Sequence, residues 1–187
     1  TGANLTHDLV EALGYKHYIG NEAMDDAKLE KDGYVRMFNS LMKSNVYVTL
    51  EKFFEKHWET ISKARNIREF LWAIGSKIEH KDSILRICYE KKIPLFCPGI
   101  ADSGIGLMVW GRLAQGKKYQ INIDVFDDMK EIIDIAWTSK KSGVLYCGGG
   151  LPKNFIQQSL QFSKGASYGV QITTDRPEPG GSSGAPL

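Results

Sequence analysis

The stretch SGVLYCGGGLPKNFIQQSL, residues 142–160, decides how this chain is interpreted. Apolar residues 144–147 run into three consecutive glycines, and Pro152 opens a segment with helical apolar spacing. This predicts a strand, a tight turn and a helix N-terminus, where proline's missing N–H is tolerated. N–H groups there, with the helix dipole, favour an anion. The stretch fits a phosphate site and, equally well, a ligand-free connection, because it matches neither G-x-G-x-x-G nor a P-loop.

Bulk composition narrows the class of protein. The 187 residues are 42% hydrophobic and 25% charged, which suits a globular domain with a substantial core. A net charge of +2 gives no support for nucleic acid or a membrane surface as partner. The N-terminus lacks the features of a signal peptide, and no apolar run approaches the about 20 residues that cross a bilayer. Three scattered cysteines suit a reducing cytoplasm, and four dispersed histidines indicate no metal site.

Both ends of the sequence look cut. Residues 1–3 have the character of a strand end whose body is missing, and residues 180–187 stop within a loop rich in glycine and serine. We expect a fragment of a larger protein, truncated at both ends. We expect residues 1–187 to form a single domain.

Helical periodicity dominates the first half of the chain, and strands alternate with helices in the second. The polar residues 15–33 are expected to form an exposed excursion. The expected helices are 6–14, 48–62, 66–78, 82–92, a helix within 102–114, 127–140 and 152–165, and the expected strands are 93–100, 118–125, 143–147 and 166–174. Strands separated by helices predict an α/β fold with a Rossmann-like parallel sheet and helices on both faces.

Small residues, hydroxyls and carboxylates follow the expected strands. They are Thr1–Asn4, Ala101–Gly104, Asp124, Gly148–Gly150 and Thr173–Asp175. In a parallel sheet the carboxyl ends of the strands share one edge, where ligands of such folds bind. Each residue alone is explained as a turn or helix-cap residue. Their recurrence favours a nucleotide-type site.

Five segments, in order, resemble the deoxyhypusine synthase family: TGANLTHDL, IPLFCPGIADSGIG, INIDVFDDM, GVLYCGGGLPKNFI and VQITTDRPEPGGSSGA. The last looks like the prokaryotic branch of that family. The resemblance implies an NAD-dependent transferase that moves the aminobutyl group of spermidine to a lysine of a translation factor precursor. It also implies a homotetramer. Alternatives are transfer to a free polyamine, as in homospermidine synthesis, and a non-catalytic nucleotide-binding member.

The resemblance also implies that residues 1–187 form a single NAD-binding α/β domain, and it implies which residues form the site. Its NAD-binding positions are Thr1, Gly2, Ala3, Asp102, Gly148, Gly149, Gly150, Thr174 and Asp175. Its substrate-binding positions are Asn154, Ser182, Ser183 and Gly184. It places the covalent lysine in an SWGK segment beyond Leu187, so no catalytic residue is expected here and the fragment is expected to be inactive. Lys153 is expected to be a solvated residue at a helix start.

Three substrate positions depart from the eukaryotic pattern of the family. Leu107 and Ser182 stand where the resemblance implies acidic residues, and Asn154 stands where it implies a histidine. Cationic amines need carboxylate partners, because an unpaired buried ammonium is costly. These departures leave the acceptor open between a protein lysine and a free amine.

Overall fold

The computed structural model describes residues 1–117 and 121–186. They form two compact units, described separately here. The N-terminal unit contains residues 2–95 and 100–123, and the C-terminal unit contains Thr1, 96–99 and the residues from Asp124 onward. The expectation of a single NAD-binding domain stays a prediction. None of the helices in the described ranges has the length and apolarity to span a membrane.

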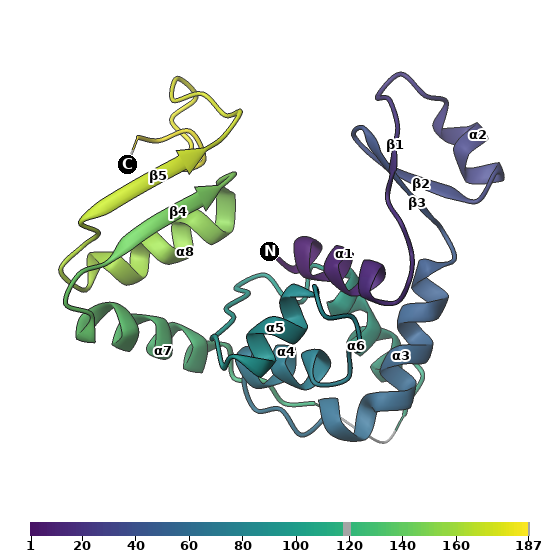
Figure 1. The fold of residues 1–187 in the computed structure, drawn as a ribbon, viewed down its shortest axis with the longest axis horizontal. Helices are drawn as coiled ribbons and strands as arrows, with labels where there is room; N and C mark the ends of the chain where they lie inside the picture. Colours follow the sequence, from purple (N-terminus) through teal and green to yellow (C-terminus); the bar gives the residue numbers. More distant parts are fainter. Residues whose placement is uncertain (118–120, 187) are drawn as a thin grey trace. The chain divides into compact units, whose positions relative to one another are not determined.

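The N-terminal unit is mainly helical (Figure 1). Its helices are α1 (Gly2–Ala12), α2 (Asp26–Lys31), α3 (Val46–Ile61), α4 (Ile67–Gly75), α5 (Ile84–Glu90) and α6 (Gly104–Ala114). Apolar residues at helical spacing, such as Leu50, Phe54 and Trp58 of α3, are buried and form the core. The expected helices at 48–62, 66–78 and 82–92 are confirmed as α3, α4 and α5.

A small antiparallel sheet interrupts the helices. Strands β1 (Tyr18–Ile19), β2 (Tyr34–Met37) and β3 (Ser40–Lys43) lie in the order β1-β3-β2. Met37 pairs with Ser40, so Phe38 and Asn39 form a two-residue hairpin turn, and Phe38 has a φ of 53°. Most of residues 15–33 are exposed, as expected, and they contain β1 and α2.

The starts of α1 and α6 pack closely within this unit. The Thr6 hydroxyl donates to the Gly2 carbonyl at 2.8 Å and accepts the Ile105 N–H at 3.2 Å. A Cβ added at Gly104 would lie 2.5 Å from Cγ2 of Thr6, so only glycine fits there without movement. The first turns of α1 and α6 therefore pack together through Thr6.

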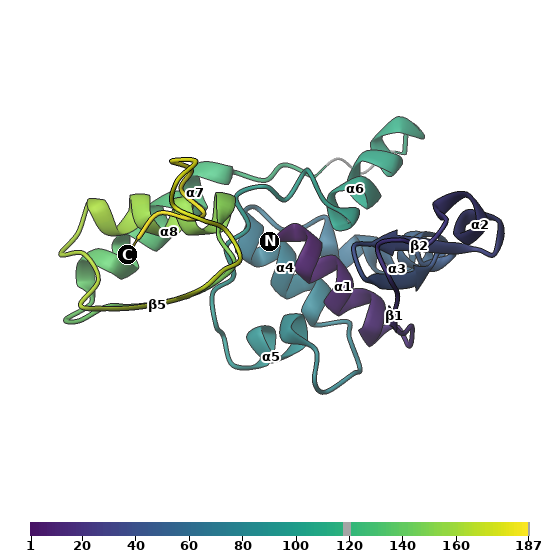
Figure 2. The same ribbon diagram turned by 90° about the horizontal axis from the view of Figure 1, so that it is seen from above.

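The C-terminal unit is built on a strand–helix–strand crossover. It consists of α7 (Val125–Thr138), β4 (Gly143–Cys147), α8 (Gly150–Gln161) and β5 (Tyr168–Ile172). β4 and β5 pair in parallel, with Tyr146 opposite Gln171. Helix α8 lies on one face of the pair (Figures 1 and 2), so Tyr146 is buried, whereas Leu145 on the other face is exposed.

The α/β class is confirmed, although the sheets are small. Residues 93–100 are irregular rather than a strand, and Pro94 and Pro98 lack the N–H that a ladder needs. Residues 121–123 form no strand, and 118–120 lie outside the described residues. Helix α1 begins at Gly2, so Gly2 and Ala3 do not end a strand. The Rossmann-like sheet covered on both faces stays a prediction, because the parallel sheet of the described residues has two strands.

Candidate functional site

The glycine turn joins β4 to α8, and its geometry explains each glycine. Gly148 and Gly150 have φ values of 90° and 65°, in the left-handed region that disfavours other residues. Gly149 is the N-cap of α8 with an extended φ of −159°. A Cβ there would lie 2.6 Å from the Cα of Ser183. Local backbone conformation and close packing thus require the glycines, whether or not a ligand binds.

The loop that contains Ser182, Ser183 and Gly184 is anchored on this turn. The Gly150 N–H donates to Oγ of Ser183 at 2.7 Å. Nε2 of Gln171 donates to the Ser183 carbonyl at 2.7 Å and to the Gly148 carbonyl at 3.1 Å. A Cβ at Gly184 would collide with the Arg176 carbonyl. The predicted cofactor glycines and the predicted substrate loop are therefore in direct contact.

Lys153 lies within the same network, and the expectation that it is solvated was wrong. Its residue exposure is 1%. Nζ donates to Oε1 of Gln171 at 2.9 Å and to the Ala185 carbonyl at 2.6 Å, and lies 5.8 Å from the ring centroid of Tyr146. These acceptors offset part of the cost of burying an ammonium. Its charge, in the first turns of α8, adds to the positive end of the helix dipole.

The remaining C-terminal candidates lie near this turn in sequence or at the same sheet edge. Asn154 follows Lys153 on α8 and is half-buried. Thr174 and Asp175 follow β5 and are exposed, and the Asp175 N–H donates to Oγ1 of Thr173 at 3.1 Å. Because β4 and β5 are parallel neighbours, both strand ends share one edge.

Three predicted NAD-binding residues belong to the N-terminal unit instead. Gly2 is buried at the start of α1, next to the exposed Ala3. Asp102 is exposed and directly precedes Ser103, whose hydroxyl caps α6 by accepting the Gly106 N–H at 3.0 Å. Thr1 is grouped with the C-terminal unit. The predicted cofactor positions are thus divided between the two units.

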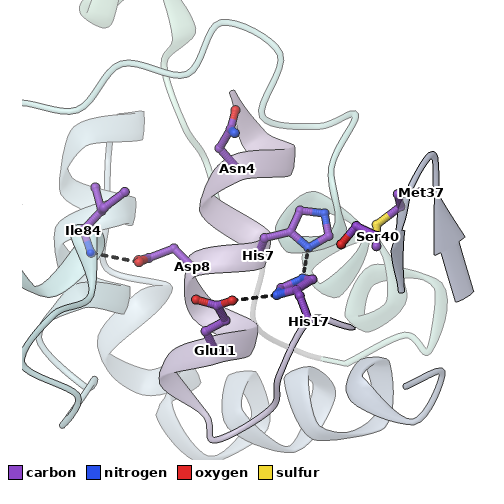
Figure 3. A pocket seen from close by; sticks show the side chains of 8 residues that line it. All are labelled: Asn4, His7, Asp8, Glu11, His17, Met37, Ser40 and Ile84. Carbon is purple, nitrogen blue, oxygen red and sulfur yellow. Dashed lines mark hydrogen bonds and ion pairs between the residues drawn. The ribbon is translucent and has the colours of Figure 1, made fainter. Parts of the chain in front are cut away.

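Sequence reasoning missed a histidine pair in the N-terminal unit. Nδ1 of His7 lies 2.9 Å from Nε2 of His17, and Nδ1 of His17 lies 2.7 Å from Oε1 of Glu11 (Figure 3). The three side chains border a cavity of about 400 Å³. Burial, and then the adjacent His17, lower the pKa of His7, and Glu11 partly opposes them. The i, i+4 spacing of His7 and Glu11 was a usable signal, whereas nothing in the sequence placed His17 beside them.

A parallel strand–helix–strand unit with a glycine turn at the helix N-terminus defines an α/β protein with a potential anion-binding turn. The chain belongs to the deoxyhypusine synthase family, whose model matches residues 1–187.

Similar proteins carry the same family name. The chain is 39% identical to a probable deoxyhypusine synthase 1 from Archaeoglobus fulgidus over its whole length, which is 60% of that protein. It is 36% identical to a probable deoxyhypusine synthase 1 from Methanosarcina acetivorans and 33% identical to a probable deoxyhypusine synthase from Methanopyrus kandleri, again over the whole chain and 59% of each relative. The chain therefore spans about three fifths of the length of these curated relatives.

Proposed function

We propose that this protein uses NAD to transfer the aminobutyl group of spermidine to a lysine of a translation factor precursor, which forms deoxyhypusine. Family membership over residues 1–187 supports the reaction class. The structural observation that carries the proposal is the contact between the glycine turn and the 182–184 loop. That contact brings the residues proposed for cofactor and for substrate into one network.

The turn has features that suit the pyrophosphate of a dinucleotide. A Cβ at Gly148 would meet no atom within 4 Å, so a ligand has room to approach the backbone on that side. The N-terminus of α8 and the buried Lys153 ammonium supply positive potential. In this proposal Gly148–Gly150 hold the pyrophosphate, and Thr174 and Asp175 contact the adenosine end. The chemistry that NAD supplies is removal and return of a hydride.

The remaining cofactor contacts of the proposal come from Thr1, Gly2, Ala3 and Asp102. Ser182, Ser183, Gly184 and Asn154 contact the substrate. The protein acts as a cytoplasmic homotetramer in this proposal, in keeping with the family resemblance. Light scattering of the full-length protein tests the tetramer, since it reports molar mass directly.

A second acceptor is favoured by two specific residues. Leu107 and Ser182 stand where the family resemblance implies acidic residues, and neither supplies a carboxylate for a cationic amine. Both are exposed, Leu107 to 51%. A charge-assisted hydrogen bond contributes about 1.5–3 kcal/mol, so loss of two such contacts changes how the donor is held. Transfer to a free polyamine such as putrescine is therefore the alternative within the same reaction class. A member that binds a nucleotide without catalysis is the alternative outside it.

One competition assay separates these proposals. Full-length protein is incubated with NAD, labelled spermidine, putrescine and the precursor protein together. Label on the precursor supports deoxyhypusine synthesis, and label in homospermidine alone overturns that acceptor. NAD binding without any transfer supports the non-catalytic alternative.

A further inference from the structure

A second cavity of the N-terminal unit, also of about 400 Å³, has an excess of positive charge in its lining. Helix α3 contributes residues at helical spacing along one stripe, namely Thr49, Lys52, Phe53, Lys56 and His57. The end of α1 and the residues that follow α4 complete the lining with Ala12, Leu13, Lys77, Ile78 and Glu79. Three lysines, one histidine and one glutamate are therefore the charged or titratable groups that line this cavity.

The glutamates of α3 do not neutralise these lysines, because each has another partner. Glu55 pairs with Lys117 at 3.0 Å, Glu59 pairs with Lys63 at 3.4 Å, and Glu51 accepts from Gln115 at 3.3 Å. Within residues 1–117 and 121–186, Lys52, Lys56 and Lys77 make no ion pair. Lys52 and Lys56 lie one turn apart on α3, where two like charges disfavour the helix. The cavity therefore holds positive charge that the described side chains leave uncompensated.

His57 reports the sign of the electrostatic potential in this cavity. The histidine is half-buried, and its ring lies edge-on to Phe53 with the ring centroids 4.9 Å apart. Burial lowers the pKa of His57, and Lys56 and Lys77 lower it further. Both of the charged neighbours that shift this pKa are positive, so the position favours an anion.

The kinds of side chain in the lining favour a phosphoryl group over a carboxylate. A phosphomonoester carries a charge of about −1.5 to −2 near pH 7 and has three acceptor oxygens, so separate donors can each bind one oxygen. Lysine binds phosphate as a point charge, whereas the planar fork of arginine matches a carboxylate, and no arginine of the described ranges lines this cavity. Leu13, Phe53 and Ile78 add apolar surface for an organic group. The volume is in the range of small-molecule sites.

We propose that this cavity binds a small organic phosphomonoester. Lys52, Lys56 and Lys77 compensate the charge of the phosphoryl group, His57 donates a hydrogen bond to one of its oxygens, and the organic group lies against Leu13 and the other apolar lining residues. This site is separate from the proposed function, since none of its residues is among the cofactor or substrate positions named above. Its test requires neither NAD nor a transfer reaction.

Calorimetry on the full-length protein, with phenyl phosphate as the probe, tests the lysine contacts. Lys56→Gln and Lys77→Gln should each weaken binding about 10-fold or more, because each removes a charge-assisted hydrogen bond. Lys56 is exposed, so its replacement leaves the packing of α3 unchanged. Lys31→Gln is the matched control, because it removes the same charge from an exposed position of α2 outside the cavity, and it should change the affinity less than about 2-fold. Absence of binding, unchanged affinity in both cavity variants, or equal weakening by Lys31→Gln overturns the proposal.

Two comparisons test the charge of the ligand and the contact with His57. Benzenesulfonate keeps the aromatic ring but carries a single charge, so it should bind about 10-fold more weakly than phenyl phosphate, and equal affinity overturns the proposal. A bound dianion raises the pKa of His57, so the ratio of wild-type affinity to His57→Gln affinity should increase as the pH falls from about 8 to about 6.5. Protonation of the probe itself cancels in this ratio. A ratio that does not change with pH overturns the proposal.

Discussion

Replacing Gly149 by alanine should undock the 182–184 loop from the glycine turn. The new Cβ would lie 2.6 Å from Cα and 2.8 Å from Cβ of Ser183, whereas ordinary contacts of a Cβ begin near 3.4 Å. The φ of Gly149, −159°, lies outside the left-handed region, and the expected effect is the steric contact of the new Cβ with Ser183. Overpacking of this kind costs about 1–3 kcal/mol, which lowers the ratio of docked to undocked loop about 5- to 150-fold.

Hydrogen–deuterium exchange on the full-length protein measures this change. Peptides that cover residues 176–185 should exchange faster in Gly149→Ala, while peptides from α3 stay protected. Gly181→Ala is the matched control, because a Cβ at Gly181 would meet no atom within 4 Å and its φ is not positive. Unchanged exchange of residues 176–185 in Gly149→Ala would refute the argument that Ser183 is held by close packing on the turn.

Three further changes test other parts of the molecule. Lys153→Met removes the donor to the Gln171 and Ala185 carbonyl oxygens and should lower the free energy of unfolding by about 1–3 kcal/mol in urea titrations. A loss below about 0.5 kcal/mol would contradict the view that these two hydrogen bonds stabilise the fold. Asp102→Ala should weaken NAD binding about 10-fold or more in calorimetry and leave the melting temperature nearly unchanged. A lower melting temperature with unchanged NAD affinity would show that Asp102 stabilises the turn and does not contact NAD. Burial, and then Lys56 and Lys77, lower the pKa of His57 below its ordinary value of about 6.5, so the unfolded state binds more protons than the folded state below that pH. The contribution of His57 to the free energy of unfolding should therefore be complete above pH 6.5 and decrease as the pH falls towards the pKa of the folded state. In pH-dependent urea titrations, His57→Gln should make this decrease smaller.

The strand–turn–helix at 142–161 was predictable because several local signals agree there. An apolar run, three glycines and an early proline each favour the same structure. The side chains that hold the turn were not predictable. Gln171 and Ser183 act from 20 or more residues away, and nothing in their local sequence indicates a contact with Gly148 or Gly150.

The errors also have local causes. The apolar run at 93–100 looks like a buried strand, yet its two prolines remove ladder donors. The β2–β3 hairpin was missed because its turn, Phe38–Asn39, lacks the glycine that usually marks such turns. Lys153 was placed in solvent because a lysine is almost never fully buried unless polar groups compensate its charge, and its acceptors come from β5 and the C-terminal loop.

The Ser183 hydroxyl occupies the Gly150 N–H, which an anion at the start of α8 would also use. Ligand binding at that N–H and docking of the loop are therefore linked equilibria, and each must weaken the other by the same factor. The apparent affinity of a ligand that needs the exposed N–H equals its intrinsic affinity multiplied by the fraction of molecules in which the loop is released. If the proposed pyrophosphate uses this N–H, the Ser183 hydroxyl would have to leave it first, so the loop would stay near the turn without that one hydrogen bond.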